Sequence, residues 1–322
     1  MIKRDSFPDI LRGFALFGIA LVNIPLLAID PVLHNEGADL TVFSNASAAF
    51  VVMAFFQAKF YLLFSFLFGY SAHYVIKDSR ANRGRWVGRS IGLVILGILH
   101  FSLLFFGDIL FLYGLFGLLL LAFYFRKETT LKVWAWVIFG ITSLLFAAFS
   151  ALTLIGEQLL ALKGKTLPEL ATEDFSEVMI STSFIESIGL RLELWLTAAP
   201  TALLLQGPLV FSAFLVGVLA ARRNSLGSSA NPATMKKLAV WGLTIGLPLQ
   251  SISAFLFIQN AVAETYSFGM YFSAISINFL TAPILSAGFV GLLWLIGQKF
   301  KLGILSSAGK YSLTIYLSQS VV

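Results

Sequence analysis

Long apolar runs recur along the whole chain, and they limit its fold more than any other feature does. A helix needs about 20 predominantly apolar residues to cross a bilayer, and runs near that length follow one another through the 322 residues. Hydrophobic residues make up 58% of the chain and charged residues 12%. Soluble domains average about 45–50% apolar and about 25% charged residues. The sequence therefore predicts an all-α polytopic integral membrane protein.

We expect a single transmembrane helical domain over residues 1–322, built as a bundle of eight or nine helices. The expected spans are residues 10–29, 48–76, 87–106, 109–125, 131–155, 198–221, 238–258 and 271–297. Residues 156–187 form a polar loop between the fifth and sixth spans. The 12 residues from Tyr311 onward are too few to cross. We therefore expect the chain to end within a partial last helix.

The distribution of basic residues predicts the orientation. With a cytoplasmic N-terminus and alternating spans, 18 of the 22 lysines and arginines fall on the cytoplasmic side. Lys163, Lys165 and Arg191 fall outside, and Lys59 lies inside the second span. Basic residues favour cytoplasmic loops, so we expect a cytoplasmic N-terminus and an extracytoplasmic loop at residues 156–187.

Composition also excludes several classes of function. The chain has no cysteine, so disulfides, thiolate nucleophiles and zinc–thiolate sites are ruled out. The formal net charge is +6, but the basic residues sit between apolar spans, so we expect the lipid bilayer and not nucleic acid as the partner. No motif indicates a metal, and the oligomeric state is left open.

Three ionisable side chains lie within or beside the apolar spans. Lys59, in FFQAKFYLLFSFLFGYS, lies about 11 residues below the outer end of its span, or roughly 16 Å at 1.5 Å per residue. His100 lies near the outer end of the third span, and Asp108 follows Gly107 in a short turn. Ionisable groups in membrane spans usually face the bundle interior and mark function. We expect these three to line one cavity.

Each of them also has a structural interpretation, and the residues alone leave both open. Lys59 forms an ion pair inside the bundle, or it holds an anionic substrate group. Asp108 caps the following helix, or it assists chemistry. His100 makes a polar contact between helices, or it takes a proton from a hydroxyl group.

The first span carries a second polar group at its inner end, in FPDILRGFALFGIALVNI. Asp9 and Arg12 are three residues apart and can pair on one helix face. The pair is either a local anchor or a site where Arg12 contacts an anionic cofactor, such as the phosphates of coenzyme A. Asn23, near the midplane, is a contact between helices or, with Tyr113, a substrate-binding residue.

The same blocks resemble a known family. FPDILRGFALFGIALVNI, KFYLLFSFLFGYS, RWVGRSIGLVILGILHFSLLFFGDILFLYGLFGLLL and AGKYSLTIYLSQS follow the order seen in YeiB-like bacterial membrane proteins, whose characteristic domain has no known function. The resemblance covers residues 9–319, and the block with His100, Gly107, Asp108 and Tyr113 is its most specific part. It implies a multi-pass protein of the bacterial plasma (inner) membrane. Family members usually continue beyond the point where this chain stops.

The first block is also similar to the LDxLRG start of the transmembrane acyltransferase superfamily. Asp9, Leu11, Arg12 and Gly13 match that pattern, but this chain has Asn23 in the region where many members carry a histidine. The similarity implies transfer of an acyl group from cytoplasmic acyl-coenzyme A to an extracytoplasmic hydroxyl or amine acceptor, on a small molecule, a lipid or a glycan.

In this hypothesis Arg12, with Asp9, contacts the coenzyme A phosphates. His100, oriented by Asp108, is the general base, and Lys59 stabilises the thioester oxygen. The alternative is a transporter or exporter of a small metabolite, with Lys59, His100 and Asp108 as the substrate or proton-coupling site. A scaffold or lipid-handling protein without catalysis is a third option.

Overall fold

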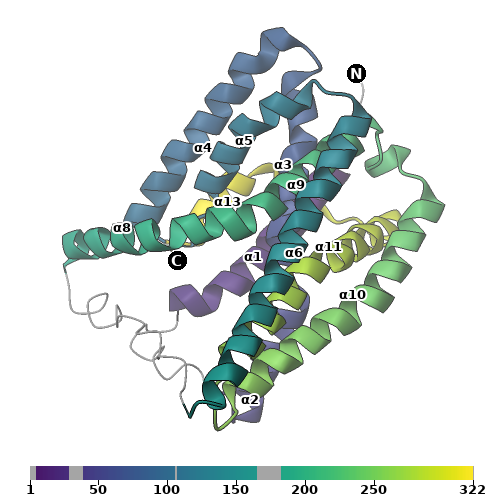
Figure 1. The fold of residues 1–322 in the computed structure, drawn as a ribbon. Helices are drawn as coiled ribbons and strands as arrows, with labels where there is room; N and C mark the ends of the chain where they lie inside the picture. Colours follow the sequence, from purple (N-terminus) through teal and green to yellow (C-terminus); the bar gives the residue numbers. More distant parts are fainter. Residues whose placement is uncertain (1–4, 29–38, 106, 165–182, 322) are drawn as a thin grey trace.

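The computed structural model describes residues 5–28, 39–105, 107–164 and 183–321. Helices and short connections make up these residues, with no strand among them, so the all-α prediction is confirmed for the described part of the chain (Figure 1). The helices are α1 Phe7–Ala28, α2 Phe43–Val51, α3 Lys59–Ile76, α4 Arg83–Leu103, α5 Leu110–Tyr124, α6 Glu128–Ala161, α8 Phe184–Thr201, α9 Gly207–Arg222, α10 Pro232–Ala261, α11 Phe268–Lys299, α12 Gly303–Lys310 and α13 Ser312–Ser318.

Seven helical segments in the described chain are long and apolar enough to cross a membrane. They are Phe7–Ile24, Phe43–Ile76, Arg80–Leu103, Glu128–Ala161, Ala202–Arg222, Pro232–Ala261 and Phe268–Lys299. The chain is therefore a multi-pass membrane protein. The expected span at residues 109–125 forms α5, which has only 15 residues. At 1.5 Å per residue α5 is about 22 Å long, short of the ~30 Å hydrocarbon core. The count of eight or nine and the orientation stay predictions.

The second expected span is not continuous. A π-helical turn, Val52–Phe56, follows α2, and Ala58 then adopts a left-handed backbone conformation with φ of 66°. The Gln57 N–H donates to the Val52 carbonyl, one residue further back than in an α-helix. This pairing leaves the Met53 carbonyl without its usual helical donor, and α3 then begins at Lys59.

Helix α4 and the short helix α5 form a tight hairpin. Gly97 of α4 lies directly against the backbone of Phe111 at the start of α5, where an added methyl group would collide with it. Close approach of this kind requires a residue without a side chain. The hairpin brings the start of α5 against the last turns of α4, as the short connection predicts.

Helix α8 crosses the end of α4 at the hairpin turn (Figure 1). Arg191 of α8 donates from Nη1 to the carbonyls of Ser102 (3.1 Å) and Leu103 (2.7 Å), which lack partners at the end of α4. Trp195 of α8 packs against Phe101 and Phe111, with ring centroids 5.7 and 4.8 Å apart. The hairpin turn is therefore covered by α8.

The expected polar loop at residues 156–187 is partly wrong. Helix α6 continues to Ala161 and α8 begins at Phe184, while residues 165–182 lie outside the described chain. Glu157 stays helical because its carboxylate accepts the Ser267 hydroxyl and the Phe268 N–H, each at 2.6 Å, at the start of α11.

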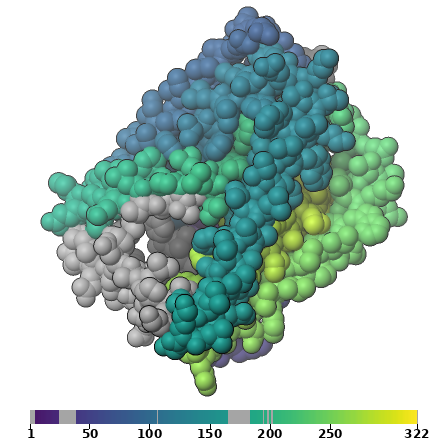
Figure 2. All heavy atoms as spheres, viewed as in Figure 1, coloured from purple at the N-terminus to yellow at the C-terminus, as the bar shows by residue number. Residues whose placement is uncertain are grey.

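Figure 2 shows α11 exposed between α6 and α10, the two helices against which it packs.

The last two helices fold back onto the first. A side chain at Gly13 of α1 would collide with the Leu305 carbonyl of α12, so these helices are in close contact. Helix α13, with 7 residues, then runs into the bundle towards the α4–α5 hairpin. It is far too short to span a bilayer.

Candidate functional site

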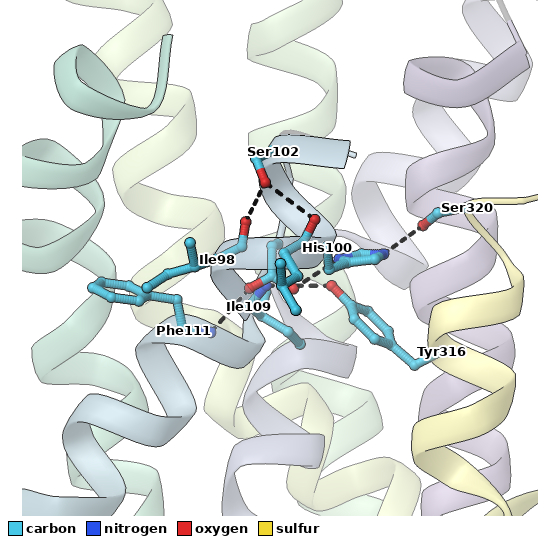
Figure 3. Close-up of polar contacts among 9 residues, drawn as sticks. Ile98, His100, Ser102, Ile109, Phe111, Tyr316 and Ser320 are labelled. Carbon is cyan, nitrogen blue, oxygen red and sulfur yellow. Dashed lines mark hydrogen bonds and ion pairs between the residues drawn. The ribbon is translucent and has the colours of Figure 1, made fainter. Parts of the chain in front are cut away.

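His100 lies between a carboxylate and a hydroxyl group in the interior of the bundle (Figure 3). Its Nδ1 is 2.8 Å from Asp108 Oδ1, and its Nε2 is 2.9 Å from Ser320 Oγ. The side chains of His100 and Asp108 are each 1% exposed. The structure thus joins two residues predicted from the sequence with a third that was not predicted.

The α4–α5 hairpin fixes the geometry of this pair. His100 lies in the last turn of α4, where its carbonyl accepts the N–H groups of Leu104 and Phe105. Asp108 Oδ2 accepts the Phe111 N–H at 2.9 Å, as a helix-capping carboxylate does. The capping interpretation of Asp108 is therefore confirmed, and the second oxygen of the same carboxylate contacts His100.

The hydrogen bonds assign the histidine tautomer. An ionised aspartate only accepts hydrogen bonds, so the proton of a neutral His100 lies on Nδ1. Nε2 then carries a lone pair directed at Ser320 Oγ. In this tautomer Nε2 accepts the hydrogen bond of the Ser320 hydroxyl, and such a nitrogen can chemically accept a proton.

Tyr316 connects the histidine to a cavity. Its ring centroid is 5.3 Å from that of His100, and its hydroxyl accepts the Ile109 N–H at 3.2 Å. Tyr316 also lines a cavity of about 110 Å³. The other residues around it are Ile19, Val22, Asn23, Phe56, Ala58, Phe60, Tyr61, Gly107, Ile109 and Gln206. Lys59, His100 and Asp108 are not among these lining residues, so the expectation that the three line one cavity is wrong for this cavity. Residues next to Asp108 and next to Lys59 line it instead.

Lys59 is fully buried, but its contacts differ from those predicted. Its Nζ donates to the Met53 carbonyl at 2.5 Å, and Asn278 Nδ2 of α11 donates to the same oxygen at 3.1 Å. Among the described residues no carboxylate lies within ion-pair distance of Lys59, and no hydrogen bond joins it to His100. Of the two alternatives for Lys59, the ion pair is not seen among the described residues, because the helix break supplies a carbonyl acceptor instead.

The remaining predicted site residues lie in different places. Asn23 lines the cavity. Tyr113 does not line it, because its hydroxyl donates to the Tyr61 carbonyl at 2.8 Å and lies 2.7 Å from the Ser65 hydroxyl. Asp9 and Arg12 pair at 2.7 Å on the first turns of α1, with side chains 2% and 18% exposed, and neither lines the cavity.

The predicted site omitted Ser320, Tyr316 and Asn278. Ser320 lies 220 residues from its partner His100, and no spacing rule connects positions so far apart. The only signal was the block AGKYSLTIYLSQS, which contains Tyr316 and Ser320. The described residues contain no group of three or more histidine, aspartate or glutamate side chains that could hold a metal ion.

Comparison with known proteins gives one family match. The family described as "Protein of unknown function (DUF418)" matches residues 220–322, the part of the chain that contains Asn278, Tyr316 and Ser320. No solved structure matches the chain.

The related proteins are bacterial. The chain is 28% identical over 344 residues to the uncharacterized protein YxaH of Bacillus subtilis, an alignment that covers 99% of this chain and 80% of YxaH. It is 34% identical over 122 residues to the uncharacterized protein YeiB of Escherichia coli, which covers 37% of this chain and 30% of YeiB. These similarities support the resemblance to YeiB-like membrane proteins.

Proposed function

We propose that the protein is an integral-membrane acyltransferase of the bacterial plasma (inner) membrane, with His100 as its general base. It transfers an acyl group from cytoplasmic acyl-coenzyme A to a hydroxyl or amine acceptor on the outer side. The observation that carries the proposal is the environment of His100. One ring nitrogen contacts a buried carboxylate and the other faces the Ser320 hydroxyl, while the ring of Tyr316, which packs near that of His100, lines a cavity.

Acyl transfer from a thioester requires a group that first accepts a proton from the acceptor and then donates it to the departing thiolate. The attacking hydroxyl or amine loses a proton, and the departing thiolate gains one. A neutral imidazole can do both. Asp108 holds the Nδ1–H tautomer and stabilises the imidazolium that forms between the two steps. Burial keeps water, a competing acceptor, away from the thioester.

The inner end of α1 fits the phosphates of a coenzyme A substrate. Arg12 bonds to Asp9 through Nη1 and carries a positive charge that attracts phosphate. Arg89 of α4 adds a second guanidinium group near the expected cytoplasmic ends of these helices. A phosphate between two such groups accepts hydrogen bonds from both. Asp9 orients Arg12 in this arrangement.

Lys59 has a different place in the proposal from the one expected. Its Nζ is committed to the Met53 carbonyl, so it stabilises the helix break that forms one wall of the cavity. In this proposal Lys59 does not act on the thioester oxygen. The polar groups that a bound substrate would meet in the cavity belong to its lining residues Asn23, Tyr61, Gln206 and Tyr316.

Release of the coenzyme A thiol tests the proposal. The chain has no cysteine, so a thiol-reactive dye detects only the thiol freed from the donor. The full chain would be reconstituted in vesicles of bacterial lipid extract and mixed with acetyl-coenzyme A. We expect His100→Ala to lower the rate of thiol release by about 10²–10⁴-fold. His73→Ala, at the other end of the bundle, should keep the wild-type rate.

Two results would overturn the proposal. One is thiol release at the same rate from wild type and His100→Ala. The other is flux of a small metabolite into vesicles free of coenzyme A that is abolished by Lys59→Ala, because a transporter would behave in that way. Binding of coenzyme A, measured by calorimetry, should weaken in Arg12→Ala under the acyltransferase proposal only.

A further inference from the structure

We propose that Ser320 is the nucleophile that first receives the acyl group, and that the cavity beside Tyr316 restricts the reaction to short acyl chains. This inference rests on the proposed function and makes the transfer a two-step reaction. The group formed in the first step is an ester between the acyl group and Ser320 Oγ.

The hydrogen bonds around His100 support the role of Ser320 as the nucleophile. Asp108 Oδ1, the two ring nitrogens of His100 and Ser320 Oγ form a continuous chain of hydrogen bonds of 2.8 and 2.9 Å. Serine, histidine and aspartate in this relation activate a serine hydroxyl on unrelated folds, and the arrangement is recognised by geometry and not by sequence order. Here α4, the α4–α5 turn and the segment after α13 supply the three groups.

The hydrogen bond of Ser320 also differs from those of three other serines in the bundle. Ser65, Ser102 and Ser318 donate to backbone carbonyls three or four residues earlier in their own helices. Such bonds satisfy a buried hydroxyl group locally. Ser320 pairs with the histidine instead, which places its oxygen where a base can remove the proton.

The size of the cavity supports the restriction to short acyl chains. Tyr316, one turn before Ser320, lines it together with Gly107 and Ile109, which flank Asp108. Its volume is about 110 Å³, and much of its wall is apolar. An apolar cavity of about 150 Å³ holds a six-carbon benzene molecule. By that scale, this cavity accepts an acyl chain of about four carbons or fewer.

In the first step, Ser320 Oγ attacks the thioester carbonyl carbon, and its proton moves to His100 Nε2. The carbon–sulfur bond breaks, and the departing sulfur takes the proton from His100. The products are acyl-Ser320 and coenzyme A with a free thiol.

The second step restores the enzyme. An acceptor hydroxyl or amine gives its proton to His100 Nε2 and attacks the ester carbonyl. The bond to Ser320 Oγ breaks, and that oxygen recovers the proton from His100. No oxidant, reductant or further reactant is needed.

Rapid quenching tests the ester directly. The full chain in vesicles is mixed with acetyl-coenzyme A that carries a radiolabelled acetyl group, quenched in acid and digested. We expect label on the peptide that contains Ser320 in the wild type and in the matched control Ser318→Ala. Ser320→Ala should carry no label, and His100→Ala should acquire it about 10²–10⁴-fold more slowly.

Ser320→Cys keeps the test valid if Ser320→Ala fails to fold. The chain has no other cysteine, so this variant should form a single acyl thioester, which neutral hydroxylamine cleaves while leaving a serine ester intact. Thiol release without label on Ser320, at the wild-type rate in Ser320→Ala, would overturn the covalent step. That result would leave direct transfer by His100, and hence the proposed function, in place.

Donor length tests the cavity. We expect acetyl- and butyryl-coenzyme A to label Ser320 and octanoyl-coenzyme A to label it at least tenfold more slowly. Ile19→Ala enlarges the cavity wall and should speed the octanoyl reaction. Phe17→Ala, on an exposed face of the same helix, should not. Equal rates for all donors in the wild type would overturn the restriction to short chains.

Discussion

Asp108 has two hydrogen-bonding roles in one carboxylate. Oδ1 contacts His100 and Oδ2 caps α5. An asparagine can still accept the Phe111 N–H, but its amide favours the histidine tautomer with the proton on Nε2. The two roles can therefore be separated by one substitution.

For Asp108→Asn we expect thiol release from acetyl-coenzyme A to fall by about 10⁴-fold, as when the triad aspartate of a serine protease becomes asparagine. The melting temperature should change little because the cap is kept. Asp78→Asn, which affects a hydrogen bond from Tyr124, serves as the control and should keep its rate. An unchanged rate in Asp108→Asn would show that Asp108 only caps α5.

Replacement of Lys59 by methionine tests whether its ammonium group is needed. Methionine has a similar length, and Asn278 still donates to the Met53 carbonyl without the lysine. A methionine also avoids the cost of burying an ammonium group that has no carboxylate partner. We expect Lys59→Met to keep its melting temperature and its thiol release rate within about tenfold. Loss of folding would show that the ammonium group is essential to the helix break.

The sequence predicted His100 and Asp108 because they stand 8 residues apart across a short turn. It did not predict Ser320, since that contact depends on how α12 and α13 fold back onto α1. The sequence also did not reveal the hydrogen-bond acceptor of Lys59, for a related reason. Its acceptor is a backbone carbonyl that becomes available only through the π-helical turn, and apolar periodicity does not reveal such a turn.

The close contact of helix α4 with helix α5 determines the position of Asp108. Gly97 leaves the space that Asp108 Oδ2 and the Phe111 backbone occupy. Gly92, on the same helix, has open space where a side chain would stand. The two glycines therefore provide a matched pair.

We expect Gly97→Ala to destabilise the protein by about 1–3 kcal/mol through overpacking and to lower thiol release by displacing Asp108. Gly92→Ala should be neutral or stabilising by up to about 1 kcal/mol because alanine favours helix. Melting temperatures in one detergent and initial rates check both. Equal effects of the two substitutions would contradict the close contact.

Most helices were predicted from apolar length alone, since a bilayer imposes that length on every span. Two elements departed from the pattern for local reasons. The segment 48–76 reads as one apolar run, but Ala58 breaks it with a positive φ that alanine rarely adopts. Helix α5 is short because the apolar run that forms it is itself short, bounded by Asp108 on one side and Arg126 on the other.

For the whole molecule, the orientation can be tested because the chain has no cysteine. We expect Ala263→Cys, in the exposed connection between α10 and α11, to react with a membrane-impermeant maleimide on intact cells. Thr129→Cys, at the start of α6, should react only after permeabilisation. The reverse pattern would place the N-terminus outside.

The helix break also has a consequence for synthesis of the protein. The Met53 carbonyl and the Lys59 carbonyl accept hydrogen bonds from Asn278 and Ser286, 225 and 227 residues later. A ribosome needs roughly 10–45 s to add that many residues. During that time the segment holds a lysine that costs about 2.5–3.5 kcal/mol at the centre of a membrane helix. The second membrane segment thus reaches its final form only after α11 has entered the bilayer, so nascent chains that stop before Asn278 should be cleared by membrane proteases.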